Sequence, residues 1–171
     1  MKRLDNGSEK DFSYNDSIEN LEKYYENQYK LIMSGNTDLA SLKLVMLGNA
    51  LDFIHFIQRS FGIKLDSSEK SVDELEEVMD ALNRGIVQEN LFSRDDGDLA
   101  KKAGAYLGFL IIANIGGSWV DTENSMAVEL QGREVYVCDF IKQRLVSGTE
   151  LNVREYYRSV RLLKTKNNDE E

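Results

Sequence analysis

Apolar residues recur every three or four positions along the first two-thirds of the chain, which is the spacing that gathers side chains on one face of an α-helix. The pattern predicts four helices, at about residues 17–34, 38–60, 71–86 and 99–115. The second segment is apolar over most of its circumference, as is typical of a helix at the centre of a domain. Its polar residues narrow to one stripe, Asp52, His55 and Arg59, at positions i, i+3 and i+7.

Short polar residues mark where the predicted helices begin. Asp16 or Ser17 precedes the first helix and Thr37 precedes the second. Side chains of these types accept hydrogen bonds from the free N–H groups of a first helical turn. Ser71 and Glu74 have the spacing of a capping box, in which each side chain bonds the backbone N–H of the other residue. These residues therefore predict where the first three helices start.

Small residues recur every four positions along the fourth predicted helix, at Ala100, Gly104 and Gly108. A glycine inside a helix costs about 1 kcal/mol of helix propensity relative to alanine, so two of them in one helix require a compensating contact. We expect that contact to be the close approach of another element, with the second helix as the expected neighbour. Gly116 and Gly117 then end the helix.

After residue 117 the hydrophobic period changes to the alternation of a β-strand. The alternation predicts three strands, at residues 118–120, 126–130 and 135–138. Gln131 and Gly132 form a tight turn between the last two strands. Two closing helices follow, at about residues 140–148 and 151–163. The predicted fold class is α+β, mostly helical, with about six helices and a small antiparallel three-stranded β-meander inserted before the last two.

One domain accounts for the chain, because 171 residues is about the length of a single compact unit. Residues 1–14 are polar and aperiodic, and we expect them to form a flexible N-terminal segment. Residues 15–163 then form a single globular domain, and residues 164–171 form a charged, flexible tail. The apolar fraction of 42% is too high for a disordered chain and suffices for a hydrophobic core.

The chain is acidic, with 30 Asp and Glu residues against 21 Lys and Arg and a formal net charge of −9. Such a surface repels phosphate backbones, so nucleic acid is not expected to be a partner. The same field attracts basic proteins and speeds their association. The alternative interpretation is that the charge serves solubility alone.

A single cysteine, Cys138, excludes an intramolecular disulfide and suits a reducing compartment. The first 14 residues contain no apolar run of the kind that a signal peptide requires. The longest apolar stretch, from Ala103 to Ile115, has about 13 residues, whereas a membrane-spanning helix needs about 20. We therefore expect a cytoplasmic protein that does not associate with membranes.

Candidate catalytic groups are few. His55 is the only histidine, and it shares a helix face with Asp52, so an Asp–His acid–base pair is one interpretation. The other interpretation places His55 at the edge of a helix interface, hydrogen-bonded to Asp52 or to a backbone carbonyl. Cys138 lies just before a predicted helix, where the helix dipole lowers a thiol pKa. Its apolar neighbours nevertheless favour a small buried hydrophobic residue over a nucleophile.

No catalytic residue, metal ligand or cofactor is predicted. One histidine and one cysteine fall short of the ligand set of a zinc site, and no phosphate-binding glycine motif is present. Aromatic residues are the remaining candidates for binding. Trp119, Tyr106, Tyr156 and Tyr157 form an aromatic recognition surface in one interpretation. In the other interpretation they pack in the core between helices and strands.

The segment GAYLGFLIIANIGGSWV, residues 104–120, is followed by a VELQGREVYV hairpin and by a helix that opens with DFIKQRLVSG. This arrangement resembles a group of small bacterial proteins of unknown function, in which an A-Y-L-G helix leads to G-G-x-W at a strand start, then a hairpin and a helix. The likeness covers about residues 100–157. It implies an accessory or immunity-type protein and no particular chemistry. The matching residues are Ala105, Tyr106, Leu107, Gly108, Gly116, Gly117 and Trp119.

Two functions from different classes are consistent with these observations. The favoured one is a non-catalytic, acidic interaction protein, an immunity or antitoxin-like inhibitor of a basic protein partner. It fits the charge, the size and the lack of a catalytic cluster. The alternative is a small enzyme or small-ligand-binding protein with a cleft near Asp52 and His55, to which Tyr106 contributes. The aromatic last helix is a candidate contact for oligomers, although nothing in the sequence fixes an oligomeric state.

Overall fold

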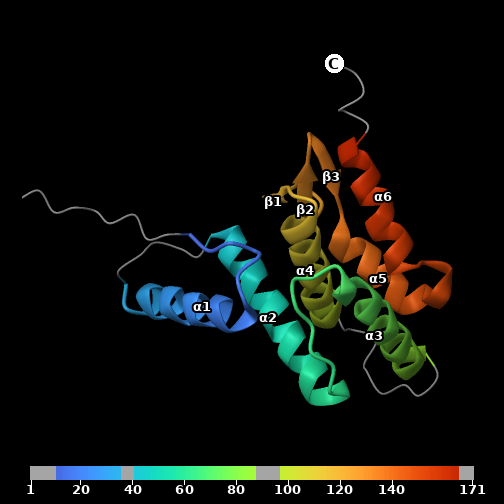
Figure 1. The fold of residues 1–171 in the computed structure, drawn as a ribbon, viewed down its shortest axis with the longest axis horizontal. Coiled ribbons are helices and arrows are strands. Elements are labelled where there is room, and N and C mark those ends of the chain that lie inside the picture. The colour runs from blue at the N-terminus through green and yellow to red at the C-terminus, as the bar shows by residue number, and fades with distance from the viewer. Residues whose placement is uncertain (1–10, 36–40, 88–96, 166–171) are drawn as a thin grey trace, which may run out of the picture.

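The computed structural model describes residues 11–35, 41–87 and 97–165. Within these residues the chain forms six α-helices, a three-stranded antiparallel sheet and one 3-10 turn (Figure 1). The sheet lies between the fourth and fifth helices, so the predicted α+β fold class is confirmed. The elements in chain order are α1 (Ile18–Met33), α2 (Leu42–Phe61), α3 (Lys70–Val87), α4 (Gly97–Asn114), β1 (Ser118–Asp121), β2 (Met126–Leu130), β3 (Arg133–Val135), α5 (Val137–Ser147), η1 (Gly148–Glu150) and α6 (Val153–Thr165).

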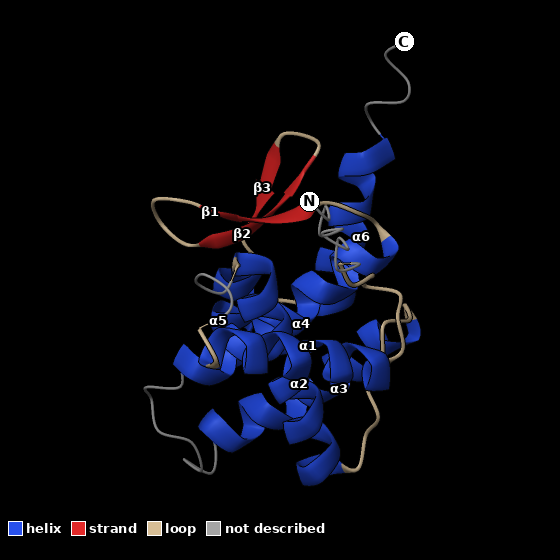
Figure 2. Cartoon of the chain, turned by 90° about the vertical axis from the view of Figure 1, so that its left-hand side faces the viewer, coloured by secondary structure: helices blue, strands red, loops and turns tan. Residues whose placement is uncertain are grey.

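Helix α4 lies at the centre of the molecule, with α2 packed along one side and α5 along the other. Helix α1 lies on the outer side of α2, away from α4, while α3 and α6 pack together beside α5 (Figure 1). The strands sit at one end of the helical bundle (Figure 2). This arrangement follows from the sequence of α4, because a helix that is apolar on all sides needs partners all round.

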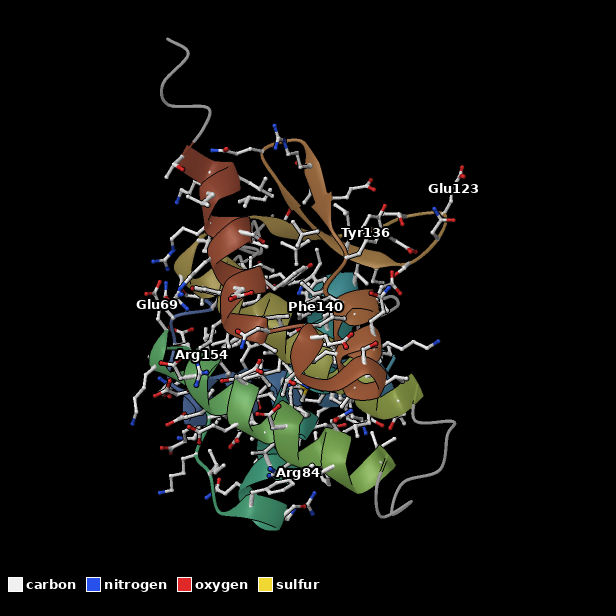
Figure 3. All side chains as sticks on the ribbon, turned by 90° about the vertical axis from the view of Figure 1, so that its right-hand side faces the viewer. Glu69, Arg84, Glu123, Tyr136, Phe140 and Arg154 are labelled. Atoms are coloured by element: carbon white, nitrogen blue, oxygen red, sulfur yellow. The ribbon has the colours of Figure 1, made fainter. Side chains whose placement is uncertain are left out.

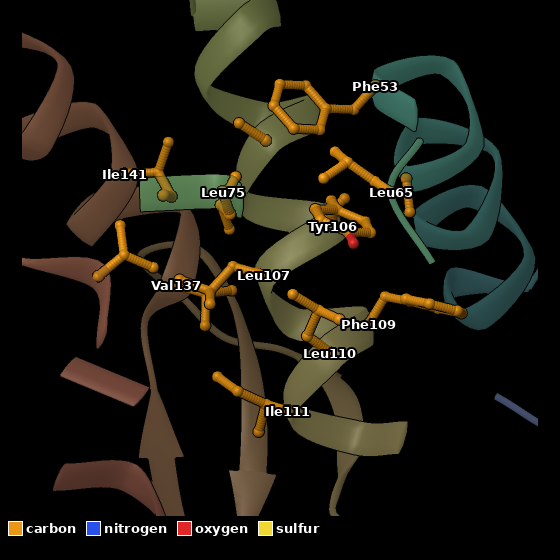
Figure 4. Close-up of a cluster of buried hydrophobic side chains, with 14 of the residues drawn as sticks. Phe53, Leu65, Leu75, Tyr106, Leu107, Phe109, Leu110, Ile111, Val137 and Ile141 are labelled. Atoms are coloured by element: carbon orange, nitrogen blue, oxygen red, sulfur yellow. The ribbon is translucent and has the colours of Figure 1, made fainter. Parts of the chain in front are cut away.

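The core surrounds α4, in which nearly every residue from Ala103 to Ile111 is buried. Phe53 of α2 approaches from one side and Ile141 of α5 from the other (Figure 4). Tyr106 is fully buried at the centre of this cluster, and its hydroxyl donates a 2.6 Å hydrogen bond to the backbone carbonyl of Asp66. The loop between α2 and α3 is thereby fastened to the central helix.

The two glycines inside α4 admit neighbours other than the predicted one. A Cβ built on Gly104 would lie 2.6 Å from the Cα of Cys138, on α5. A Cβ built on Gly108 would overlap the ring of Trp119, on β1. The expectation that these glycines admit α2 is therefore wrong. Helix α2 packs on a different side of α4, where Phe53 meets Tyr106 with ring centroids 5.8 Å apart.

Two helices begin at a serine cap. The side chain of Ser17 accepts a 3.2 Å hydrogen bond from the N–H of Asn20, so this predicted start of α1 is confirmed. Ser41 caps α2 in the same way, accepting from the N–H of Leu44 at 3.2 Å. Helix α2 thus begins later than predicted, and the expected cap at Thr37 lies outside the described residues.

The predicted capping box at the start of α3 is wrong. Ser71 lies inside the helix, and its N–H already bonds the backbone carbonyl of Ser68. Its hydroxyl lies 3.1 Å from carboxylate oxygens of both Asp66 and Glu74. The N–H that needs a side-chain acceptor here belongs to Ser68, which donates to Asp66 at 2.8 Å. The motif was misassigned because several short polar residues cluster in this connector.

The sheet has the order β1-β2-β3 and is antiparallel throughout, with Trp119 opposite Val128 and Leu130 opposite Arg133. Gln131 and Gly132 form its two-residue turn with φ values of 52° and 74°. Positive φ at both positions is the geometry that matches the twist of a hairpin, so the predicted turn is confirmed.

The third strand and the fifth helix meet earlier than predicted. The sequence pattern extends the strand to Cys138, whereas β3 ends at Val135 and α5 begins at Val137. A short apolar run does not distinguish a strand from a buried helical turn. Contact with α4 decides the outcome, because Val137 is fully buried and Cys138 fits against Gly104 only from a helix.

Part of the predicted N-terminal flexible segment belongs to the core. Phe12 is buried, with its ring centroid 5.0 Å from that of Tyr14 and 5.1 Å from that of Tyr24. Tyr14 in turn packs on Phe109 of α4 at 5.7 Å. The boundary predicted at residue 14 is therefore too late, because a few aromatic rings anchor an otherwise polar segment. Residues 1–10 and 166–171 lie outside the described residues.

Candidate functional site

The polar stripe predicted on α2 forms an exposed face between α1 and α4. Asp52, His55 and Arg59 are all exposed to solvent, and α1 and α4 lie on opposite sides of α2 (Figure 1). The reason is local, since most of the other residues of α2 are apolar and many of them are buried in the core. This face, which we call the α2 face, carries two of the predicted site residues.

His55 is bound to α1 rather than to its neighbour on α2. Its Nε2 lies 2.8 Å from a carboxylate oxygen of Glu22. This contact agrees with the interpretation that places His55 at the edge of a helix interface, but the partner is Glu22 rather than Asp52 or a backbone carbonyl. Glu22 was missed because its position on the polar side of α1 predicts only a solvated carboxylate. An Asp52–His55 acid–base pair is not formed.

Asp52 faces the opposite direction, towards α4. The ammonium group of Lys102 lies 3.6 Å from Asp52 and 3.0 Å from Asp98, so one cation sits between two carboxylates. The hydrogen bond to Asp98 holds the pKa of Lys102 above its ordinary value. Both carboxylates stay open to solvent, with side chains 64% and 73% exposed. This arrangement could not be predicted, because α2 and α4 are brought together only by the fold.

A pocket of about 390 Å³ opens beside this ion cluster, between α2 and α4. Phe53 is buried at its base, and the half-buried Phe56 and Leu99 form apolar walls. The lining residues are Asp52, Phe53, Phe56, Arg59, Asp98, Leu99 and Lys102. His55 and Tyr106 are not among them, so the three residues expected to share one cleft do not converge.

Tyr106, a predicted binding residue, is a core residue. Its side chain is fully buried, and burial raises the pKa of its hydroxyl well above the ordinary value. The hydroxyl is occupied by the carbonyl of Asp66. Trp119 is half-buried, with its ring against Gly108. For both residues, core packing rather than a recognition surface is the interpretation that the contacts support.

The two tyrosines of α6 have different environments, one against Phe140 and the other near Glu69, and Figure 3 labels both of these neighbours. Tyr156 stacks on Phe140 of α5 with ring centroids 3.8 Å apart and planes 11° from parallel. Tyr157 is buried on the side facing α3, with its hydroxyl 3.3 Å from Glu69. Burial raises the pKa of Tyr157 to about 12. The aromatic residues predicted to form one recognition surface therefore lie at separate places in the fold.

Cys138 lies in the first turn of α5, against Gly104 of α4. Burial raises the pKa of its thiol to about 11, whereas the position at a helix start predicted a lowered value. Desolvation by the packed α4 backbone outweighs the helix dipole here. A thiol with this pKa is almost wholly protonated at neutral pH, which suits a packing residue rather than a nucleophile.

The C-terminal half of α1 exposes large apolar side chains to solvent, which was not predicted. In this helix Leu21 is the one fully buried residue, and Tyr25 covers Gly48 of α2. Further along, Tyr29 is 52% exposed and Met33 is 70% exposed. Helix α1 crosses the outer side of α2 and its C-terminal half extends beyond it (Figure 1). The apolar spacing over residues 17–34 predicted a helix, but it did not show that α2 covers only the first half of its apolar face.

A buried ion cluster joins the helices on the other side of the molecule. Arg144 of α5 is fully buried, 2.7 Å from Glu76 and bonded to Asp80, both on α3. The second carboxylate oxygen of Glu76 accepts the backbone N–H of Val153, at the start of α6, at 2.6 Å. Among the described residues, none accepts a hydrogen bond from Nε or Nη1 of Arg144. The cluster connects three helices and lies away from the α2 face.

The described parts of the chain contain no group of three or more His, Cys, Asp or Glu side chains placed to hold a metal ion. None of the described helices combines the length and apolar character needed to cross a membrane. Comparison of the sequence and structure with protein-family models, curated proteins and solved structures found no match.

Proposed function

We propose that this chain is a non-catalytic, acidic interaction protein that binds a basic protein partner, in the manner of an immunity protein or antitoxin-like inhibitor. The observation that carries the proposal is the exposed C-terminal half of α1, where the side chain of Tyr29 is 52% exposed and that of Met33 is 70% exposed. Tyrosine and methionine are enriched in protein interfaces. A large apolar side chain in solvent gains free energy when a partner buries it.

Charge gives the partner its expected character. Glu22, Glu26 and Asp52 lie on α1 and on the α2 face, and the whole chain carries a net charge of −9. Such a field accelerates the association of a basic protein and disfavours acidic ones. The apolar side chains of α1 would then supply most of the binding free energy at short range. The carboxylates would favour basic partners over acidic ones.

The residues weighed for catalysis support a non-catalytic protein. His55 pairs with Glu22 rather than with Asp52, and the raised pKa of Cys138 disfavours a thiolate. Tyr106 is bonded to the backbone in the core. An enzyme would need a nucleophile or base positioned beside a cleft, and these three groups lie in three different environments.

The test is capture of a partner from the native host by the tagged chain, compared between wild type and a Tyr29→Ser, Met33→Ser variant. We expect the wild type to retain a basic protein and the variant to lose most of it. The matched control is Val146→Ser, Leu162→Ser, which removes two comparably exposed apolar side chains from α5 and α6. The control should retain the partner.

Salt dependence tests the electrostatic part of the proposal. The association rate of the captured protein should fall steeply as ionic strength rises, because surface charges are screened over about 10 Å at 0.1 M salt. Equal retention by wild type and the α1 variant, or a captured partner that is acidic, would contradict the proposal.

A further inference from the structure

The pocket between α2 and α4 combines an apolar base with two open carboxylates. Phe53 and Phe56 are one turn apart on α2, and Leu99 faces them from α4. The volume of about 390 Å³ is at the lower end of the range for ligand sites. Its walls suit an extended aliphatic or aromatic group, and its rim suits a positive charge.

The rim is already built around a cation. Asp52 and Asp98, on different helices, both contact the ammonium group of Lys102, and both side chains remain mostly exposed. A carboxylate can accept about four hydrogen bonds, so each keeps outward-facing acceptors. A guanidinium has five donors in a planar fork and can bond two carboxylates at once. It also stacks favourably on an aromatic ring such as that of Phe56.

We infer that this pocket receives an arginine side chain of the basic partner, with the aliphatic stem against Phe56 and Leu99 and the guanidinium between Asp52 and Asp98. The inference rests on the proposed function, because it names an anchor residue for that partner. An arginine buried in a pocket at an interface is typical of a binding hot spot.

The two resident cations determine how the arginine is held. Lys102 is less exposed than either carboxylate, so it approaches them from the α4 side and leaves their outer lone pairs open. Arg59 lies two helical turns from Asp52, about 10 Å along the axis. Its Nε is directed to the backbone carbonyl of His55. Arg59 also lines the pocket, so its charge partly offsets that of the two carboxylates there.

The experiment is a titration of the isolated, isotope-labelled chain with N-acetyl-arginine amide, followed by amide chemical shifts. We expect shifts that saturate and that concentrate on residues lining the pocket. N-acetyl-citrulline amide, which has the same shape without the charge, should bind at least about fivefold more weakly, since it lacks the ion pairs. Equal binding of both probes, or shifts spread over the whole surface, would overturn the inference.

Substitutions of the charged lining residues test which side chains hold the arginine probe. Asp52→Asn and Asp98→Asn should each weaken the arginine probe by about fivefold, and Lys102→Met should strengthen it by about twofold or more, because it frees both carboxylates. Asp121→Asn, which removes an exposed carboxylate from β1, is the matched control and should leave binding unchanged. Weakening by Lys102→Met, with the chemical shifts of the free protein otherwise preserved, would overturn the inference.

Two further comparisons are needed. One distinguishes an arginine side chain of a protein from free arginine as the ligand, and the other distinguishes failure of this inference from failure of the proposed function. Free arginine that binds tenfold or more tightly than the blocked probe would show a small-molecule site and would overturn the inference. Loss of partner capture by the α1 variant, combined with no binding of the arginine probe, would remove this inference and leave the proposed function standing. If the α1 variant and the Asp52→Asn and Asp98→Asn variants all lose partner capture, the result supports both the proposed function and this inference.

Discussion

At the scale of single residues, two neighbours approach α4 closely at positions that lack a side chain. Gly104 allows the backbone of α5 to pack closely against the backbone of α4, and Gly108 does the same for the ring of Trp119. Each glycine weakens the helix by about 1 kcal/mol, and close packing of larger neighbours offsets that cost. Their importance is therefore steric, and it can be tested by adding one methyl group.

Gly108→Ala should destabilise the fold by about 1–3 kcal/mol, although alanine is the better helix former. The added Cβ would overlap the ring of Trp119, which must then move out of its site. The free energy of unfolding, measured by urea denaturation, tests this. Gly97→Ala is the control, because a Cβ there meets no atom of the described residues within 4 Å. Equal stability of the two variants would argue against a steric need for glycine.

The thiol of Cys138 should titrate late. Its pKa is raised by burial to about 11 from an ordinary value of 9.0, so the folded state binds the proton more tightly than the unfolded state. The stability that this contributes is fully present below pH 9.0 and is lost as pH rises towards about 11. The rate of alkylation of the native protein, measured against pH, should have its midpoint near 11. A midpoint at or below 9.0 would show that burial does not raise the pKa of this thiol.

At the scale of elements, the sequence predicts those features that depend on neighbours along the chain. The cap at Ser17 and the turn at Gln131-Gly132 are local, and both are as predicted. The start of α5 at Val137 and the true neighbours of Gly104 depend on contacts between distant segments. Hydrophobic spacing shows that a face is apolar, but it does not show which element covers that face.

The buried ion cluster also depends on distant segments, because α3, α5 and α6 meet only in the fold. Glu76→Ala should destabilise the protein by about 3 kcal/mol, since it leaves the buried guanidinium of Arg144 and the N–H of Val153 without a main partner. Chemical denaturation measures the change. Asp73→Ala is the control, because it breaks an exposed pair with Arg154 and should cost less than about 1 kcal/mol. Comparable losses in both variants would show that burial of the cluster is unimportant.

At the scale of the whole molecule, the fold has a firmly packed centre and a weakly held flank. Helix α4 is buried on every side, whereas α1 has one fully buried residue. Native-state hydrogen exchange should therefore show α1 amides opening at a lower free energy than α4 amides, which exchange only on global unfolding. Equal protection of α1 and α4 would mean that α1 is fixed by contacts beyond those described.

The same contrast explains which parts of the candidate site could be predicted. The stripe of Asp52 and His55 was found because it lies on one helix, and its exposure follows from the apolar remainder of α2. Glu22, Asp98 and Lys102 were missed, since each belongs to another helix that reaches the stripe only after folding. The aromatic residues were grouped too readily, because their type does not reveal that Tyr106 is in the core while Tyr156 is stacked on α5.

The ion cluster of Arg144 has a consequence for synthesis of the chain. Glu76 and Arg144 are 68 residues apart, and Glu76 and Val153 are 77 apart. During translation the carboxylate emerges well before the cation and the N–H that satisfy it. Helix α3 therefore cannot bury this face until α5 and the start of α6 have left the ribosome. The last fifth of the chain thus completes the fold, and nascent chains that end before it should keep α3 open to proteases.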